Sequence, residues 1–167
     1  MNEDRITEVF DKIYETGALI IKPAKADELT RCQQDLADIH VPQLPADYIE
    51  FLQIANGLAW NGFEFYGTYQ VTEKKSGYCL KDIVSANIKW HDRKIGLAGK
   101  LLLGTFDDDI YVYAPESAEY QTLDSLTLSE IDTCESFEEL FIANVAAYVD
   151  DDEDWPFDDE DASREDD

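Results

Sequence analysis

The sequence predicts an α+β domain in which N-terminal helices lead into a mostly antiparallel, twisted sheet and a C-terminal helix closes the fold. Near both ends of the ordered part, apolar residues recur at the i, i+3, i+4 spacing of helices that bury one face. Between these regions the pattern changes to short apolar and aromatic runs bounded by turn-forming residues, which is typical of strands.

Two helices and a short extended segment are predicted before residue 40. The apolar stripe of the first helix ends at Gly17 and comprises Ile6, Val9, Phe10, Ile13 and Tyr14. Ala18 to Lys22 is expected to be extended. The second helix is predicted from about Lys25 to Ile39, with one face formed by Leu29, Cys32, Leu36 and Ile39.

A third helix is predicted between Leu44 and Gly57. Pro45 suits a first helical turn, because proline has the required φ and its missing N–H would have no partner there. The apolar stripe consists of Tyr48, Phe51, Leu52 and Ala55. Asn56 and Gly57 tolerate left-handed geometry, so we expect the helix to stop there.

The second half contains the predicted strands and the closing helix. The strands are Phe63–Tyr66, Leu101–Leu103, Ile110–Tyr113 and Tyr120–Leu123, with a helix from Lys81 to Asp92 between the first two. Ser136 and Glu139 have the spacing of a capping box. The helix that they begin is expected to bury Phe137, Leu140, Phe141, Val145 and Tyr148.

Charge divides the chain into an acidic body and a more acidic tail. The net charge is −25 and the pI about 4.1, and from Asp150 onward twelve acidic residues accompany a single base, Arg164. We predict an N-terminal helix and connector over 1–24, the main domain over 25–149 and a disordered tail over 150–167. Such a chain repels nucleic acids and anionic membranes and attracts basic proteins, so we expect a basic protein partner and a monomer or weak dimer.

The sequence also indicates the compartment. It contains no apolar run long enough to span a membrane, and its start, Met1 to Arg5, is polar and acidic, unlike a signal peptide. Three widely spaced cysteines make a disulfide framework improbable. We therefore expect a cytoplasmic protein.

Motifs for catalysis or cofactor binding are absent from the sequence. His40 and His91 stand alone, and there is no nucleophile elbow, phosphate loop or dinucleotide fingerprint. We expect no enzyme activity, no cofactor and no metal.

Three groups of residues are candidates for binding a partner. Asp107, Asp108 and Asp109 form either a solvated hairpin turn that also guards the sheet edge, part of an acidic partner-binding face, or a cation site. Trp60 and Tyr66 are either core residues or an aromatic anchor. Trp155 and Phe157, within the tail, either dock into a partner or belong to a segment that only keeps the protein soluble.

The order of several motifs resembles the SUKH superfamily of Smi/Knr-like domains, and most of all its YrhA-like bacterial branch. The similarity covers residues 25–149 and rests on four segments: Leu44-Pro45 with Tyr48, Phe51-Leu52 and Asn56-Gly57; Phe65-Tyr66-Gly67; Leu103-Gly104-Thr105 with Ile110-Tyr111; and Glu135 to Phe141.

This resemblance implies an α+β fold without catalytic residues. Bacterial members are mostly immunity proteins that bind and neutralise a cognate toxin, so the expected function is occlusion of a toxin's active surface, with a basic nuclease favoured by the charge. The alternative that the eukaryotic relatives suggest is a regulatory interaction module, a scaffold linked to cell-envelope assembly.

Overall fold

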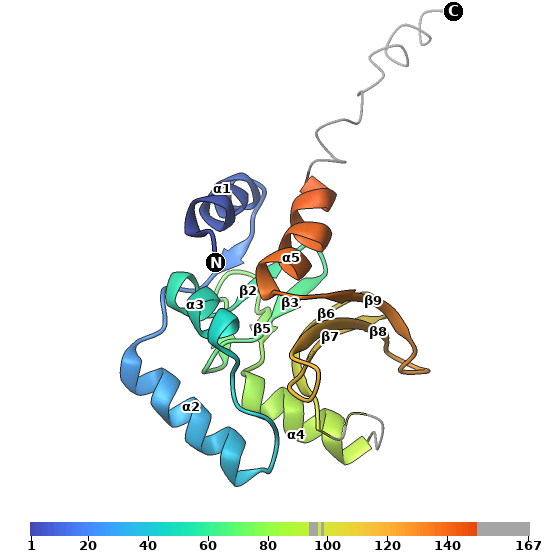
Figure 1. Cartoon of the computed structure of the whole chain (residues 1–167). Helices are drawn as coiled ribbons and strands as arrows, with labels where there is room; N and C mark the ends of the chain where they lie inside the picture. Colours follow the sequence, from blue (N-terminus) through green and yellow to red (C-terminus); the bar gives the residue numbers. More distant parts are fainter. Residues whose placement is uncertain (94–96, 98, 150–167) are drawn as a thin grey trace, which may run out of the picture.

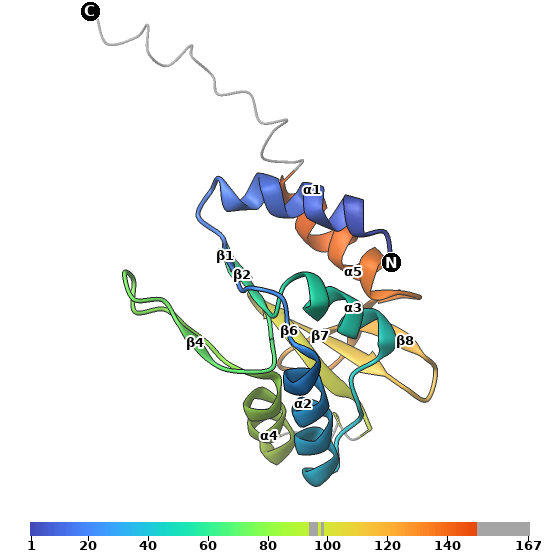
Figure 2. The ribbon, with the colours of Figure 1, turned by 90° about the vertical axis from the view of Figure 1, so that its left-hand side faces the viewer.

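The computed structural model describes residues 1–93, 97 and 99–149, and it confirms the predicted α+β architecture (Figure 1). In this part of the chain a seven-stranded antiparallel sheet has the order β1-β2-β3-β6-β7-β8-β9, and β4 pairs with β5 in a separate two-stranded ribbon. Helix α5 lies on one side of the sheet and α4 on the other (Figures 1 and 2).

The helices are α1 (Glu3–Tyr14), α2 (Ala26–Asp38), α3 (Ala46–Ile54), α4 (Ile83–Arg93), α5 (Phe137–Phe141) and the π-helical segment η2 (Ile142–Ala146). The strands are β1 (Leu19–Ile20), β2 (Leu58–Trp60), β3 (Phe63–Phe65), β4 (Val71–Thr72), β5 (Cys79–Leu80), β6 (Leu101–Phe106), β7 (Asp109–Ala114), β8 (Glu119–Asp124) and β9 (Glu130–Cys134).

All the predicted helices and strands are present, whereas β2, β9 and the β4–β5 ribbon were not predicted. Strand β2 begins immediately after Gly57 and is three residues long, too short to display a period. Strand β9 is an exposed edge strand, and its alternation of Glu130, Ile131 and Asp132 lacks the apolar run used to recognise strands.

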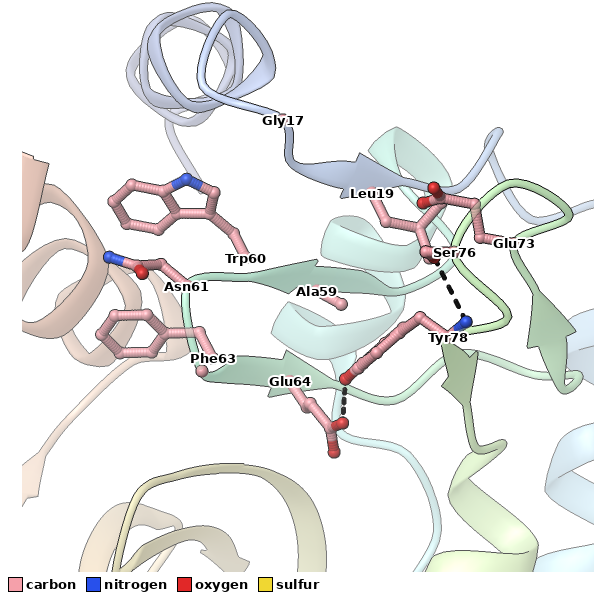
Figure 3. A pocket seen from close by; sticks show the side chains of 11 residues that line it. Gly17, Leu19, Ala59, Trp60, Asn61, Phe63, Glu64, Glu73, Ser76 and Tyr78 are labelled. Atoms are coloured by element: carbon pink, nitrogen blue, oxygen red, sulfur yellow. Dashed lines mark hydrogen bonds between the residues drawn. The ribbon is translucent and has the colours of Figure 1, made fainter.

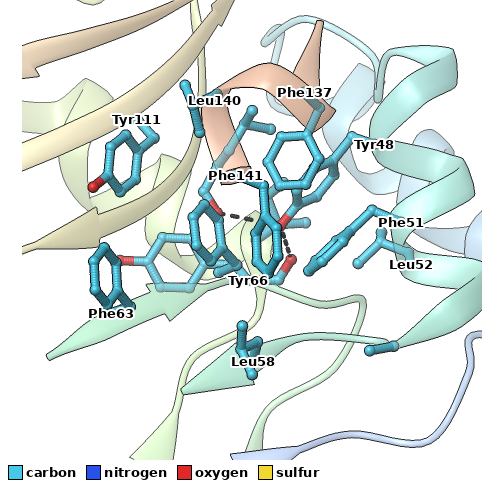
Figure 4. Close-up of a cluster of buried hydrophobic side chains, with 14 of the residues drawn as sticks. Tyr48, Phe51, Leu52, Leu58, Phe63, Tyr66, Tyr111, Phe137, Leu140 and Phe141 are labelled. Atoms are coloured by element: carbon cyan, nitrogen blue, oxygen red, sulfur yellow. Dashed lines mark hydrogen bonds between the residues drawn. The ribbon is translucent and has the colours of Figure 1, made fainter. Parts of the chain in front are cut away.

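The core is an aromatic cluster between the sheet and helices α3 and α5 (Figure 4), and α1 also packs against it. Phe51 of α3 lies 4.8 Å from Phe137 and 5.6 Å from Phe141, measured between ring centroids. Phe10 of α1 approaches Phe51 and Phe141 at 5.9 Å each. The first helix therefore belongs to the same core as the main domain.

Helix α3 follows the predicted stripe but ends differently from the prediction. Tyr48, Phe51, Leu52 and Ala55 are all buried. Pro45 precedes the first turn as N-cap, Ala55 leaves the helix in an extended conformation, and Gly57 alone takes a left-handed φ of +109°. Asn56 is not left-handed. It is buried, and its Oδ1 accepts from the Thr68 N–H at 2.8 Å, so its role is to bind the chain that leaves β3.

The closing helix also departs from the prediction at both ends. The Ser136 hydroxyl accepts from the Glu139 N–H at 3.2 Å, but the Glu139 carboxylate accepts from the N–H of Glu135 rather than from that of Ser136. Phe137, Leu140, Phe141 and Val145 are buried as predicted. Tyr148, which was predicted to be buried, is 36% exposed, although its ring still packs edge-on against Trp60 and Phe63 at centroid distances of 5.6 and 5.9 Å.

The β4–β5 ribbon projects from the body (Figure 2) and lies next to the β2–β3 hairpin.

Among the described helices, none has the length and apolar character that a membrane crossing requires.

Candidate protein-binding surface

Asp107 and Asp108 form the predicted hairpin turn between β6 and β7, and Asp109 is the first residue of β7. Asp107 has a left-handed φ of +49°, and the carbonyl oxygen of Asp108 accepts from the Ser125 N–H at 2.8 Å. This bond ties the turn to the loop between β8 and β9. The predicted role in guarding a sheet edge is wrong, since β6 and β7 are interior strands and the edges are β1 and β9.

Like charges gather where these two loops meet. Partial burial, followed by the neighbouring carboxylates of Asp124, Asp108 and Asp107, raises the pKa of Asp109. Asp124 has the opposite shift: N–H groups of Thr127 and Leu126 donate to its carboxylate at 2.8 and 2.9 Å and lower its pKa. The loop thus stabilises one carboxylate as an anion beside another whose ionisation is disfavoured.

A cation site at this turn lacks the necessary ligands in the described structure. Within residues 1–93, 97 and 99–149, no three His, Cys, Asp or Glu side chains converge as metal ligands would. Exposed Asp107 and Asp108 are better placed to meet cationic side chains of another protein.

The two aromatic candidates differ in position. Tyr66 is 4% exposed, and burial raises the pKa of its hydroxyl to about 12, so this side chain is part of the core and offers little surface. Trp60 lies at the end of the β2–β3 hairpin, where its indole Nε1 donates to the Thr16 hydroxyl at 2.9 Å. Its ring stacks on Phe63 at a centroid distance of 6.1 Å. Trp155 and Phe157 lie outside the described residues.

A pocket of about 490 Å³ opens between the β2–β3 hairpin and the β4–β5 ribbon (Figure 3). Leu19 and Ala59 are apolar lining residues, and Trp60 also contributes to the lining. The carboxylate of Glu64 accepts a hydrogen bond from the Tyr78 hydroxyl, which reaches across from the ribbon. Burial and this carboxylate raise the pKa of Tyr78, so its hydroxyl remains a donor at neutral pH.

The pocket adjoins the aspartate turn. Gly62 belongs to its lining, and a Cβ added at Gly62 would lie 3.7 Å from the Asp107 carboxylate oxygen Oδ1. The fold thus brings Trp60 and the aspartates Asp107, Asp108 and Asp109 to one end of the sheet, although more than forty residues separate them in sequence. Tyr66 is not part of this surface.

Sequence reasoning missed two exposed aliphatic residues on the neighbouring β8–β9 hairpin. Leu126 is 79% exposed and Ile131 is 56% exposed. A signal for this acidic and apolar surface was available: residues 101–149 contain eleven acidic residues and no lysine, arginine or histidine. We define the acidic end by Asp107, Asp108, Asp109, Asp124 and Leu126.

Two of the three cysteines, Cys32 and Cys134, have thiols that are poorly suited to act as nucleophiles. Burial raises the pKa of the Cys32 thiol to about 12, and the charges of Asp35 and Asp82 add to the effect, so the thiolate is scarce at neutral pH. Burial, followed by Asp132 and Glu139, also raises the pKa of Cys134.

Comparison with known proteins yields no family: no protein-family model matches the chain, and no curated protein matches it significantly.

Proposed function

We propose that this chain is a non-catalytic binding protein of the cytoplasm, an immunity protein that neutralises a basic bacterial toxin by covering its active surface. A nuclease is the toxin class that fits best, because a nuclease channel is lined with cations that bind phosphates. The resemblance to the SUKH superfamily motivates the immunity role, and the charge motivates the choice of partner.

The observation that carries the proposal is the one-sided charge of residues 101–149. This segment provides β6 to β9 and α5, and its eleven acidic side chains have no basic residue among them. Within the described residues, Met1 pairs with Glu50 and Arg5 pairs with Glu138, and no aspartate of the acidic end belongs to either ion pair. The negative charge of these aspartates can therefore attract a cationic partner.

Charge complementarity of this kind mainly speeds association and selects the partner. The exposed side chain of Leu126 supplies apolar area within the same surface. A few apolar anchors surrounded by charge are a common design of protein interfaces.

The test is co-expression with the product of the directly adjacent gene. Protection of the host, together with salt-sensitive binding of a basic toxin, is the expected result. Reversal of two charges, Asp107→Lys with Asp108→Lys, should weaken binding about tenfold or more. The matched control, Glu8→Lys with Asp11→Lys on exposed α1 positions, should have a much smaller effect.

Failure of protection with every adjacent toxin, and no basic protein bound at low salt, would overturn the proposal. Binding to an envelope-assembly protein without any toxin nearby would favour the regulatory alternative instead.

A further inference from the structure

We infer that the pocket between the β2–β3 hairpin and the β4–β5 ribbon is a receptor for an arginine side chain of a partner protein. This inference rests on the proposal of a basic partner and assigns one contact within it. Its support comes from the composition of the pocket, its charge and its place beside the acidic end.

The lining has the two components that an arginine side chain requires. Leu19 and Ala59 provide apolar surface for the aliphatic stem. The ring of Tyr78 and the carboxylate of Glu64 lie next to each other (Figure 3), so a guanidinium can stack on one and pair with the other.

The charge of the pocket favours a cation. Glu64 and Glu73 both belong to the lining, and no lysine, arginine or histidine is among the described residues that form it. Lys74 and Lys75 follow Glu73 on the ribbon, but they are exposed and outside the lining. The Tyr78 hydroxyl donates to only one oxygen of Glu64, which leaves the second oxygen as an acceptor.

The location extends the proposed interface. Gly62 belongs to the pocket lining and lies next to Asp107, so the pocket and the acidic end are near enough to be contacted by one partner. A volume of about 490 Å³ falls within the usual range for ligand sites and accommodates a long side chain without rearrangement.

The test uses N-acetyl-arginine methylamide as the probe and the full chain as the receptor, observed by ¹H–¹⁵N NMR at low salt. Saturable shifts are expected at the Trp60 indole N–H and the amides of Ala59, Gly62 and Tyr78. The corresponding citrulline compound, which has the same shape without the charge, should not bind. A lysine probe that binds more tightly than arginine would overturn the choice of guanidinium.

Two variants and one control make the test specific. Glu64→Gln and Tyr78→Ala should each raise the dissociation constant of the probe about fivefold. Glu116→Gln removes an equal charge from the exposed β7–β8 turn, at the opposite end of the strands. This control should leave the dissociation constant of the probe unchanged. Tyr78 is 39% exposed, so its replacement is not expected to unfold the protein.

Shifts spread over the whole acidic surface, or equal effects of Glu64→Gln and Glu116→Gln, would show general charge attraction and overturn the inference. The result can be separated from the proposed function. A pocket that binds arginine in a chain that protects against no toxin leaves the inference standing alone. A toxin whose binding ignores Glu64→Gln, with no arginine binding, overturns the inference while the function stands.

Discussion

Asn87 of α4 completes the hydrogen bonding of β6 where β3 no longer runs beside it. Strand β3 pairs with β6 from Gly104 to Phe106. At Leu102 the Asn87 side chain replaces a strand: its Oδ1 accepts from the Leu102 N–H, and its Nδ2 donates to the Leu102 carbonyl oxygen, both at 2.9 Å. One fully buried amide thus joins the helix to the sheet.

Asn87→Ala should lower the free energy of unfolding by about 2–4 kcal/mol, because two buried backbone groups lose their partner and a cavity remains. Urea denaturation measures the change. Ser85→Ala, at an exposed position of the same helix, serves as the control and should be nearly neutral. Equal stability of the two variants would mean that the amide contributes little to holding α4 on β6.

Removal of the Asp109 charge is expected to stabilise the folded protein in a pH-dependent way. Its folded pKa is above the ordinary value of 3.8, so the ionised carboxylate destabilises the folded state at neutral pH, and this effect disappears as the pH falls toward 3.8. Asp109→Asn should therefore stabilise the protein at pH 7 by about 0.5 kcal/mol, a small value because solvent screens the charges. The gain should vanish below pH 3.8.

The control for Asp109 is Asp124→Asn. The folded pKa of Asp124 is lowered, so its carboxylate contributes stability at neutral pH that is lost as the pH falls through that folded pKa. Unfolding measured at neutral pH should give opposite signs for the two variants, and both effects should fade at acidic pH. The same sign for both would contradict the electrostatic account of this loop.

At the scale of elements, α5 is the part of the fold that joins the other helices to the sheet. Phe137 lies 4.9 Å from Tyr48 of α3 and 5.6 Å from Phe65 of β3, measured between ring centroids. The Phe137 N–H also donates to the Asp47 carboxylate at 3.3 Å. The closing helix, which continues from α5 through η2, depends on such contacts, because a helix of only a few turns has little stability alone.

Phe137→Ala should cost about 3–5 kcal/mol of unfolding free energy as a large-to-small change in a packed core. Thermal or urea unfolding measures it, with Tyr14→Ala as the control, because Tyr14 is an aromatic residue that is 71% exposed. A neutral result for Phe137→Ala would refute the packing of the closing helix.

At the scale of the whole molecule, charge and stability are separate properties. The hydrophobic core forms among residues 6–149, whereas the highest density of acidic residues is in the tail, which lies outside the described residues. The tail has little apolar content apart from Trp155 and Phe157. Its contribution is expected in association rates more than in folding.

Deletion of residues 151–167 should change the free energy of unfolding by less than about 1 kcal/mol, because little apolar surface is lost. The same deletion should slow association with a basic partner, most of all at low salt. Calorimetry and stopped-flow kinetics give the two readouts. A large fall in melting temperature, reproduced by Trp155→Ala with Phe157→Ala, would show instead that the tail docks on the domain.

The elements that the sequence predicted depend on residues close together in the chain, and those that it missed depend on residues far apart. The stripes of α1, α2, α3 and α5 were largely evident in the sequence, because helical periodicity is local. Tyr14 was wrongly assigned to the stripe of α1: it is 71% exposed, because it lies in the last turn, beyond the residues that α1 buries. The edge strand β9 and the ribbon were not, because their pairing depends on distant partners and their residues are exposed. In the candidate site the aspartate turn was predicted, while the pocket beside Gly62 depends on contacts between segments far apart in the chain.

By itself, the sequence determined the fold class, the helical core stripes and the acidity that restricts the choice of partners, all of which depend on composition or short-range spacing. The tertiary structure decided where the two candidate aromatic residues lie. Both are buried, Tyr66 at 4% and Trp60 at 8% exposure, but only Trp60 borders the pocket beside Asp107. The physical reason is that burial and juxtaposition arise when the β2–β3 hairpin pairs with β6, and a local pattern does not contain that long-range pairing.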